Sequence, residues 1–380
     1  MSKVLLVTND FPPTVGGIQS YLRDFVEHLG ADEIAVFAST QDAEAARAHD
    51  AAVGYRVHRW PRRVMLPTPA TAREMARVIA EEGAETVWFG AAAPLGLLAD
   101  AARRAGARRI VATTHGHEVG WSMLPGARRL LRRIFRRADV VTYISDYTRR
   151  RLARLLSGTE LVHLPSGVDT DLFHPIDDAA RADVRATFGV GADAPLVVVI
   201  SRLVPRKGQD QLIRAWPAVR GKVPGARLLV VGRGRYESTL RILARRAGEG
   251  VELTGPLDFD RMRALLAAAD VAAMPARTRF GGLDVEGLGI VYLEAQSSGV
   301  PVLAGRSGGA PETVTPETGV VVDGCDLPAI EEALVGLLSD PERRARMGRA
   351  GRAHAEGAWS RGEMDLRLRR ALGLGEGPGL

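Results

Sequence analysis

The chain has 380 residues, of which 46% are hydrophobic and 25% are charged, and its formal net charge is +6. These values are ordinary for a globular protein of two domains, and no apolar run reaches the ~18–20 residues that a membrane-spanning helix needs. The single cysteine, Cys325, excludes an internal disulfide framework and a cysteine zinc cluster. The first residues are too short and too strand-like for a signal peptide, so we expect a cytoplasmic protein.

Short apolar runs of strand character alternate with helical stretches along the chain. In the first half, the expected strands are Lys3–Thr8, Ile34–Ala38, Thr86–Gly90, Arg109–Thr114, Asp139–Ile144 and Glu160–Leu164. In the second half, they are Pro195–Ser201, Arg227–Gly232, Val251–Thr254, Asp270–Pro275, Pro301–Gly305 and Gly319–Asp323. Nearly continuous apolar strands between helices indicate parallel sheets covered on both faces. We therefore predict an α/β protein with two doubly wound domains.

Turn residues between Leu164 and Pro175 mark the expected boundary between the domains. We place the N-terminal domain at residues 1–168 and the C-terminal domain at 169–356. The segment from Arg352 to Arg370 is expected to be a helix that follows the second sheet. We expect this last part of the chain, about 357–380, to return to the N-terminal domain.

The candidate ligand-binding residues follow the carboxyl ends of expected strands. Gly16 and Gly17 follow the first strand, His115 follows the strand that ends at Thr114, and Arg202 follows the first strand of the second half. In doubly wound domains, ligands bind beyond these strand ends. We therefore expect the two domains to face each other across a cleft lined by both sets of loops.

Two acidic residues, Glu286 and Glu294, stand eight positions apart, with Arg202 and Lys207 upstream. In a continuous helix, eight residues rise ~12 Å, whereas two carboxylates that hydrolyse one glycosidic bond lie ~5–10 Å apart across it. The pair is better suited to hold two separate hydroxyl-bearing parts of one long ligand, such as a hexose and a ribose joined by a diphosphate. Glycines between the acids would free backbone N–H groups for phosphate, and the two cations would balance its charge.

Three other patterns point to chemistries that the sequence does not favour. Val231–Gly234 supplies two glycines of a dinucleotide fingerprint but no third at the proper place, which argues against a dehydrogenase. His115 and His117 lie two positions apart beside Glu118 without further clustered ligands, so a neutral histidine facing a sugar hydroxyl is favoured over zinc. Ser145 is expected to cap a helix, and no nucleophile elbow surrounds it.

One segment has paired arginines every four residues: Arg128, Arg129, Arg132, Arg133, Arg136 and Arg137. It belongs to residues 1–168, which carry 23 Lys and Arg against 17 Asp and Glu, whereas residues 169–380 carry 28 against 28. As a helix it has one basic face, with Leu131, Ile134 and Phe135 largely on the other. Either attraction to an anionic lipid surface or an ordinary solvated face explains this pattern, and no nucleic-acid-binding motif accompanies it. Phe11, Trp121 and Met123 are expected to add apolar edges nearby.

The order of these residues resembles the two-domain retaining glycosyltransferases of family four, which have the GT-B fold. The resemblance rests on Gly16, Gly17, His115, Arg202, Lys207, Glu286 and Glu294 and extends across nearly the whole chain. Three segments, Asn9–Leu22, His115–Trp121 and Arg279–Gly289, look like the actinobacterial mannosyltransferases that use GDP-mannose to extend phosphatidylinositol mannosides. The resemblance implies a peripheral enzyme at the inner face of the plasma membrane, with Arg128, Arg129, Arg132, Arg133 and Arg136 near the membrane and the acceptor.

Carried over by position, the resemblance implies roles for the catalytic candidates. Arg202 and Lys207 would hold the diphosphate, Glu286 would contact the hexose hydroxyls, and His115 would meet the transferred sugar. The acceptor hydroxyl would enter on the face from which the diphosphate leaves. The two cations would then stabilise the departing charge.

The resemblance also implies the remaining donor contacts. Glu294 would bind the ribose, Asp258 lies where relatives recognise guanine, and Gly16 and Gly17 would approach the donor closely. Backbone contacts to sugar and phosphate would come from Gly289, Ile290 and Val291. The family needs no divalent metal, so we expect neither a metal nor another cofactor.

Four alternatives remain open from the sequence. Another glycolipid, such as a glycosylated diacylglycerol, could be the acceptor, or a UDP-sugar could be the donor. The two-domain design would also suit a nucleotide-sugar epimerase. A non-catalytic sugar-nucleotide or lipid-binding protein is the fourth alternative, although it would not need Arg202, Lys207, Glu286 and Glu294 together.

Overall fold

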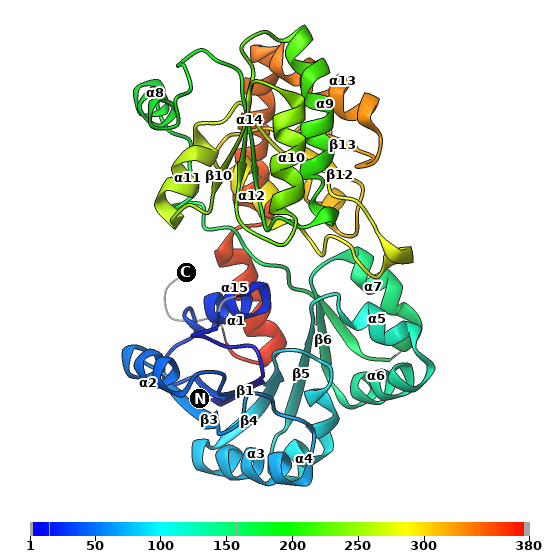
Figure 1. The fold of residues 1–380 in the computed structure, drawn as a ribbon. Helices are drawn as coiled ribbons and strands as arrows, with labels where there is room; N and C mark the ends of the chain where they lie inside the picture. The colour runs from blue at the N-terminus through cyan, green and yellow to red at the C-terminus, as the bar shows by residue number, and fades with distance from the viewer. Residues whose placement is uncertain (1–2, 15, 157, 376–380) are drawn as a thin grey trace. The chain divides into compact units, whose positions relative to one another are not determined.

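The computed structural model describes residues 3–14, 16–156 and 158–375, and the chain divides into two compact units. The first unit takes in the described residues up to Ser166 and those from Gly362 onward, and the second runs from Gly167 to Arg361 (Figure 1). Each unit has its own parallel sheet and its own hydrophobic core. The prediction of an α/β protein with two doubly wound sheets is confirmed.

The sheet of the first unit has the strand order β3-β2-β1-β4-β5-β6-β7, and its adjacent strands are parallel. Its strands are β1 Lys3–Thr8, β2 Ile34–Ser39, β3 Arg56–Trp60, β4 Ala84–Phe89, β5 Arg109–Thr114, β6 Val140–Tyr143 and β7 Glu160–His163. Because successive side chains of a strand point to opposite faces, Val4 and Leu6 enter one core cluster, whereas Leu5 and Val7 enter the other. Both faces of this sheet are therefore covered.

Helices cover the two faces of this sheet. They are α1 Gly17–Val26, α2 Ala43–Ala52, α3 Pro69–Glu82, α4 Ala99–Arg104, α5 Glu118–Met123, α6 Pro125–Arg137, α7 Asp146–Leu152 and α15 Arg361–Leu372, with the short 3-10 helices η1 Leu95–Leu98 and η2 Ala153–Leu155. Buried residues of α1 and α15 share one core cluster, and those of α3 and α6 share the other. The helix that ends the described chain thus completes the first unit.

The strand β3 was not expected from the sequence. Three of its five residues, Arg-Val-His-Arg-Trp, are charged or polar, and all five are partly or fully exposed. Within the described residues, β3 pairs with β2 alone and forms the edge of the sheet. An edge strand that is not buried on both faces does not need the continuous apolar run that identified the other strands.

The second sheet has the strand order β10-β9-β8-β11-β12-β13, again with parallel neighbours. Its strands are β8 Leu196–Ile200, β9 Arg227–Val231, β10 Val251–Gly255, β11 Val271–Met274, β12 Val302–Gly305 and β13 Gly319–Val322. The central strands β8 and β11 are neighbours in this sheet. The loop after β8 carries Arg202, and the loop after β11 carries Glu286. All the strands expected in this half are present.

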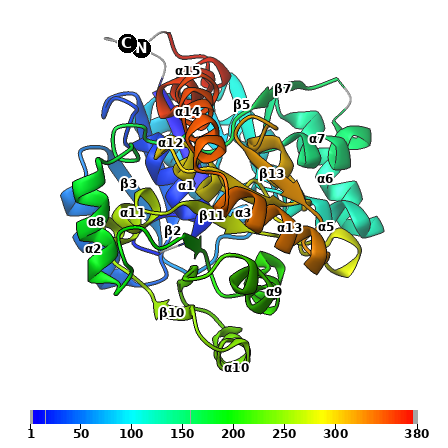
Figure 2. The same cartoon turned by 90° about the horizontal axis from the view of Figure 1, so that it is seen from above.

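The helices of the second unit are α8 Asp178–Thr187, α9 Gln209–Lys222, α10 Glu237–Ala247, α11 Phe259–Ala267, α12 Ile290–Ser297, α13 Leu327–Leu338 and α14 Pro341–Ala358, with the 3-10 helices η3 Pro205–Lys207, η4 Phe280–Gly282 and η5 Ala310–Thr313. The helices α9, α10 and α13 lie together on one face of the sheet, and α12 packs with α14 on the other (Figures 1 and 2). Within the described residues, every helix is too short or too polar to cross a bilayer.

The helix expected from Arg352 to Arg370 is two helices, so that part of the prediction is wrong. The helix α14 ends at Ala358 and α15 begins at Arg361. The break is held by Val168, whose N–H donates to the Trp359 carbonyl at 2.8 Å and whose carbonyl accepts from the Arg361 N–H at 3.0 Å. These bonds to another segment replace helical ones. Beyond the break, α15 packs on the first unit, as expected, and Thr86 Oγ1 donates to the carbonyl of Leu372 at 3.1 Å.

Candidate functional site

The loop after β8 carries the two candidate cations and has a fixed backbone. Gln209 Nε2 donates to Ser201 Oγ at 2.7 Å and to the Arg202 carbonyl at 3.0 Å. Gly208, with φ of 78°, begins α9, and a Cβ there would lie 2.1 Å from the Pro275 carbonyl oxygen. Only glycine fits such a left-handed, crowded position. The turn therefore brings η3, with Lys207 at its end, against the loop that follows β11.

Lys207 meets Glu286 in the second unit. Its Nζ lies 2.7 Å from Glu286 Oε2, and both side chains are largely buried. The backbone of Glu286 is fixed on both sides, because its N–H donates to Ser307 Oγ at 3.2 Å and its carbonyl accepts from the Gly309 N–H at 3.0 Å. The structure thus brings together a cation and an acid that stand 79 positions apart in the sequence. Arg202 is exposed, and its side chain makes no ion pair with the described residues.

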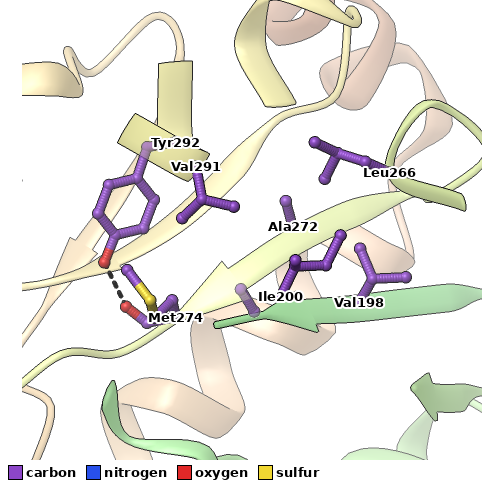
Figure 3. Close-up of a pocket in the computed structure, with 8 residues that line it drawn as sticks. Val198, Ile200, Leu266, Ala272, Met274, Val291 and Tyr292 are labelled. Atoms are coloured by element: carbon purple, nitrogen blue, oxygen red, sulfur yellow. Dashed lines mark hydrogen bonds between the residues drawn. The ribbon is translucent and has the colours of Figure 1, made fainter. Parts of the chain in front are cut away.

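The helix α12 begins just after Glu286, at Ile290. Its N-cap, Gly289, has φ of 88° and provides no side-chain cap, so the N–H groups of Ile290 and Val291 are available to an anion, whereas that of Tyr292 donates to the Gly289 carbonyl at 3.0 Å. The side chains of Val291 and Tyr292 anchor this end of the helix over β8 and β11 in a small apolar cavity, where the Tyr292 hydroxyl donates to the Met274 carbonyl (Figure 3). Glu294 lies in the next turn and is partly exposed. Because Glu286 precedes the helix, the two acids do not share a continuous helical segment.

Asp258 and Ser145 both cap helices. Asp258 accepts a hydrogen bond from the Arg261 N–H at 2.9 Å at the start of α11 and is exposed. Its expected contact with guanine stays a prediction, since the observed bond already explains an aspartate at this position. Ser145 accepts from the Thr148 N–H at the start of α7, as the sequence predicted.

His115 belongs to the first unit, at the carboxyl end of β5. Its Nε2 lies 2.7 Å from the Gly90 carbonyl oxygen and donates to it, which leaves Nδ1 as an acceptor. The ring meets Tyr21 edge-on, with centroids 4.9 Å apart. Burial, helped by the neighbouring His117 and opposed by the hydrogen bond to Gly90, lowers the pKa of His115 to about 4. A neutral imidazole at this position fits the expected contact with a sugar hydroxyl, which stays a prediction.

The low pKa of His115 predicts a specific pH dependence. In the unfolded chain this histidine takes a proton near its ordinary pKa of 6.5, whereas in the folded chain it does so at about 4. Protonation of the unfolded state therefore reduces the contribution of His115 to stability as the pH falls from 6.5 to about 4. An NMR titration of the His115 ring should show a midpoint well below 6.5, and His115→Gln should remove that part of the stability slope. A midpoint near 6.5 would contradict this account.

Gly16 and Gly17 stand at the start of α1. Gly16 is extended, with φ of 179°, and a Cβ there would meet only the flexible end of Gln19 at 2.3 Å. A Cβ on Gly17 would enter open space. The fold of the first unit therefore has little need of glycine here, which is consistent with the close approach of a ligand. That contact stays a prediction.

The arginine-rich segment is the helix α6, and its apolar side is as predicted. Leu131, Ile134 and Phe135 are buried in the core of the first unit. Two of the arginines are paired, because Arg133 Nη2 and Arg137 Nε each lie 3.1 Å from a carboxylate oxygen of Asp100. The basic face is therefore less positive than the sequence suggested. One surface hollow is lined by the exposed Arg129, Arg133, Arg136 and Arg137 and by the half-buried Arg132.

The expected apolar edges near α6 need correction. Phe11 is 1% exposed and belongs to the core, where it packs against Tyr55, so it offers no surface edge. The sequence could not show this, because the loop around Phe11 folds inward over the end of the sheet. Met123 is exposed as expected, the exposed Leu124 follows it between α5 and α6, and Leu130 is exposed within α6.

Three residues at the Lys207–Glu286 contact were not predicted. Arg206 Nη1 lies 3.4 Å from Asp284 Oδ1, and its Nε lies 3.8 Å from Glu286 Oε2. Gly308, with φ of 55°, lies so close that a Cβ would be 1.9 Å from the Glu286 carbonyl oxygen. The pair Arg206-Lys207 was visible in the sequence, but nothing there showed that both side chains turn toward one carboxylate.

One group of side chains has spacing suited to a metal ion within the described residues: His58, Glu81 and Glu82. Lys3 Nζ lies 2.6 Å from Glu82 and Arg56 Nε lies 3.1 Å from it, so protein cations already balance this buried carboxylate. The group lies at the edge strand β3 and the end of α3 in the first unit. The expectation that the protein needs no metal stays a prediction.

The sequence matches two family descriptions that together span most of its length. Residues 15–172 match Glycosyltransferase Family 4, and residues 181–354 match Glycosyl transferases group 1. The first match includes Gly16, Gly17 and His115, and the second includes the donor candidates from Arg202 to Glu294.

Among curated proteins, a relative from Corynebacterium glutamicum is 57% identical over 371 residues, which are 97% of each chain. It is named GDP-mannose-dependent monoacylated alpha-(1-6)-phosphatidylinositol monomannoside mannosyltransferase. A relative from Mycolicibacterium smegmatis, 56% identical over 97% of this chain and 98% of its own, is named GDP-mannose-dependent alpha-(1-6)-phosphatidylinositol monomannoside mannosyltransferase. Among solved structures, Anabaena HepE in complex with UDP aligns with a TM-score of 0.82 and 19% identity over 98% of this chain and 99% of its own, which shows a shared fold.

Proposed function

Because this chain belongs to glycosyltransferase family 4, we propose that it transfers mannose from GDP-mannose to a phosphatidylinositol monomannoside, with retention of configuration. The relatives from Corynebacterium and Mycolicibacterium carry this donor and this acceptor in their names. Within the chain itself, the proposal rests on the 2.7 Å contact between Lys207 and Glu286 beside the uncapped start of α12. One place thus offers a cation and N–H groups for a diphosphate and a carboxylate for a sugar.

The donor would be held by one group for each of its parts. The diphosphate charge would be balanced by Lys207 and Arg202. The N–H groups of Ile290 and Val291 would donate hydrogen bonds to its oxygens, and the proposed donor site therefore contains no metal. Glu286 would accept hydrogen bonds from the hexose hydroxyls once Lys207 turns to the phosphate. The ribose would bind Glu294, one turn into α12. Asp258 would face guanine.

The proposed reaction exchanges two bonds at the anomeric carbon of mannose. The bond to the diphosphate oxygen breaks with its electron pair on that oxygen, and the acceptor hydroxyl oxygen bonds to the same carbon on the same face. The acceptor proton passes to the departing phosphate oxygen. Lys207 and Arg202 would stabilise the negative charge that develops there, while the neutral Nδ1 of His115 would accept a hydrogen bond from the transferred sugar.

The test is a product assay with purified protein. GDP-mannose together with a phosphatidylinositol monomannoside should yield a dimannoside and one GDP for each product, whereas UDP-sugars should not react. Absence of both products would overturn the proposed function. Turnover with a UDP-sugar alone, or with a glycosylated diacylglycerol alone, would move the protein to another activity of the family, and sugar conversion without acceptor would identify an epimerase.

We also propose that the protein acts at the inner face of the plasma membrane as a peripheral protein. Its acceptor would be anionic and anchored in the bilayer. The helix α6 presents Arg129, Arg132 and Arg136, for which the structure shows no ion pair among the described residues. Exposed Met123 and Leu124 lie just before these arginines along the chain and could enter the headgroup region.

Reversal of Arg129, Arg132 and Arg136 to glutamate should weaken binding to vesicles that contain phosphatidylinositol by at least about 100-fold, since each basic residue near an anionic surface adds about 1 kcal/mol. The matched control reverses Arg241, Arg245 and Arg246, which are exposed on α10 of the second unit. Vesicle sedimentation at fixed ionic strength measures both. Equal binding by the two triple variants would make α6 an ordinary solvated helix.

A further inference from the structure

Arg206 lies beside the Lys207–Glu286 contact and is held on several sides. Its Nη1 lies 3.4 Å from Asp284 Oδ1 and its Nε lies 3.8 Å from Glu286 Oε2. The backbone is fixed as well, because the Arg206 carbonyl accepts a hydrogen bond from the Arg277 N–H at 2.8 Å. The side chain is only 19% exposed. Arg206 therefore has little freedom to reach a ligand, but it lies within a short movement of Glu286.

Two buried atoms at this place lack a hydrogen bond among the described residues: Arg206 Nε and Glu286 Oε2. Glu286 Oε2 still has a charged partner, because Lys207 Nζ lies 2.7 Å from it. Buried polar atoms without partners are costly and uncommon. An approach of ~0.9 Å would bring Arg206 Nε to ~2.9 Å from Oε2, which would give Nε a partner and give Oε2 a second cation.

The donor would change the charges around Glu286. A diphosphate attracts Lys207, and its own negative charge then lies near a carboxylate whose side chain is 8% exposed. A buried carboxylate that loses its cation is strongly destabilised. A second cation is therefore needed if Glu286 is to hold the hexose while Lys207 holds the phosphate.

We propose that Arg206 is a positioning residue that becomes the partner of Glu286 when the diphosphate draws Lys207 away. This inference rests on the proposed donor site. Asp284 holds the far side of the guanidinium and is itself 3.5 Å from Arg279, so Arg206 is oriented before the donor arrives. Arg206 acts on the sugar only through Glu286. Its guanidinium group is planar and permanently charged, so it can contact the carboxylates of Asp284 and Glu286 at the same time.

A purely structural role for Arg206 makes a different prediction. If Arg206 only fastened the loop through Asp284, its loss would weaken the binding of GDP and of GDP-mannose in the same proportion. GDP lacks the hexose that Glu286 would contact, so a positioning role affects GDP-mannose more. The ratio of the two affinities therefore separates the roles.

Calorimetry with GDP and with GDP-mannose, on wild type, Arg206→Gln and Arg206→Lys, tests the proposal. In Arg206→Gln, the ratio of the affinity for GDP-mannose to the affinity for GDP should be about tenfold lower than in wild type. This is the effect expected when one hydrogen bond to a charged group is lost. Arg206→Lys should recover part of the ratio. Arg246→Gln, which changes an exposed arginine of α10, is the matched control and should keep the wild-type ratio.

The outcomes separate this inference from the proposed function. If wild type binds GDP-mannose and Arg206→Gln keeps the wild-type ratio, the inference is overturned and the proposed function stands. A ratio that falls equally in Arg206→Gln and Arg206→Lys also overturns it, because charge would then not restore the contact. Wild type that binds neither nucleotide overturns the proposed function together with the inference. Retained GDP binding shows that a variant is folded.

Discussion

Replacement of Lys207 by alanine is expected to lower kcat/KM for GDP-mannose by about 10²–10³-fold. The departing diphosphate would lose a largely buried cation, and such groups stabilise developing negative charge more strongly than exposed ones. The contact at 2.7 Å with Glu286 shows that Lys207 already points to the place where the acid is held. Initial rates of GDP release at several donor concentrations measure the effect.

Two further variants make this result interpretable. Lys207→Arg keeps the charge and should recover part of the rate, although the planar guanidinium group of arginine does not fully replace the compact ammonium group of lysine. Lys222→Ala changes a mostly exposed lysine of α9 and should leave the rate unchanged. A rate of Lys207→Ala near that of Lys222→Ala would remove Lys207 from the mechanism. Arg202→Ala should also be slow, with an unchanged melting temperature, because its exposed side chain makes no ion pair with the described residues.

Gly308→Ala is expected to destabilise the second unit by about 3 kcal/mol and to slow turnover at least about 100-fold. The new Cβ would lie 1.9 Å from the Glu286 carbonyl oxygen, and φ of 55° is unfavourable for alanine. Since neither backbone can yield without moving the other, the loop that carries Glu286 would be displaced. A displacement of ~1 Å at a reacting site can cost about 10²-fold in rate.

Urea unfolding and the GDP-release assay measure the two effects of Gly308→Ala. The matched control is Gly336→Ala inside α13, where the new Cβ would make an ordinary contact at 3.5 Å and should raise helix stability slightly. If Gly308→Ala were as stable and as active as this control, the close contact between the Gly308 and Glu286 backbones would not matter to the site.

The central strands were predictable from the sequence because they consist almost entirely of apolar residues. A strand such as β8, Leu-Val-Val-Val-Ile, is buried on both faces, so its sequence is a continuous apolar run. The edge strand β3 lacks this signal, since its side chains are partly or fully exposed and only two of the five are apolar. The break at Trp359 was hidden for another reason. It depends on hydrogen bonds from Val168, a residue 191 positions earlier, and no local pattern shows such a pairing.

The donor candidates were predictable in kind but not in arrangement. Arg202, Lys207 and Glu286 follow strand ends, and the topology of a doubly wound sheet brings such loops together. The sequence did not show that Lys207 and Glu286 touch, or that Arg206 and Asp284 extend the contact. Those facts depend on side-chain directions set by Gly208 and Gly308. Phe11 was misplaced for a similar reason, because an apolar residue in a loop can turn inward or outward.

The most direct test is a crystal structure of the protein with GDP-mannose bound. The account predicts that Lys207 Nζ leaves Glu286 and lies within hydrogen-bond distance of the diphosphate, that α12 points its first N–H groups at a phosphate oxygen, and that Glu286 accepts from a mannose hydroxyl. A diphosphate bound elsewhere, with the 2.7 Å contact between Lys207 and Glu286 intact, would contradict it.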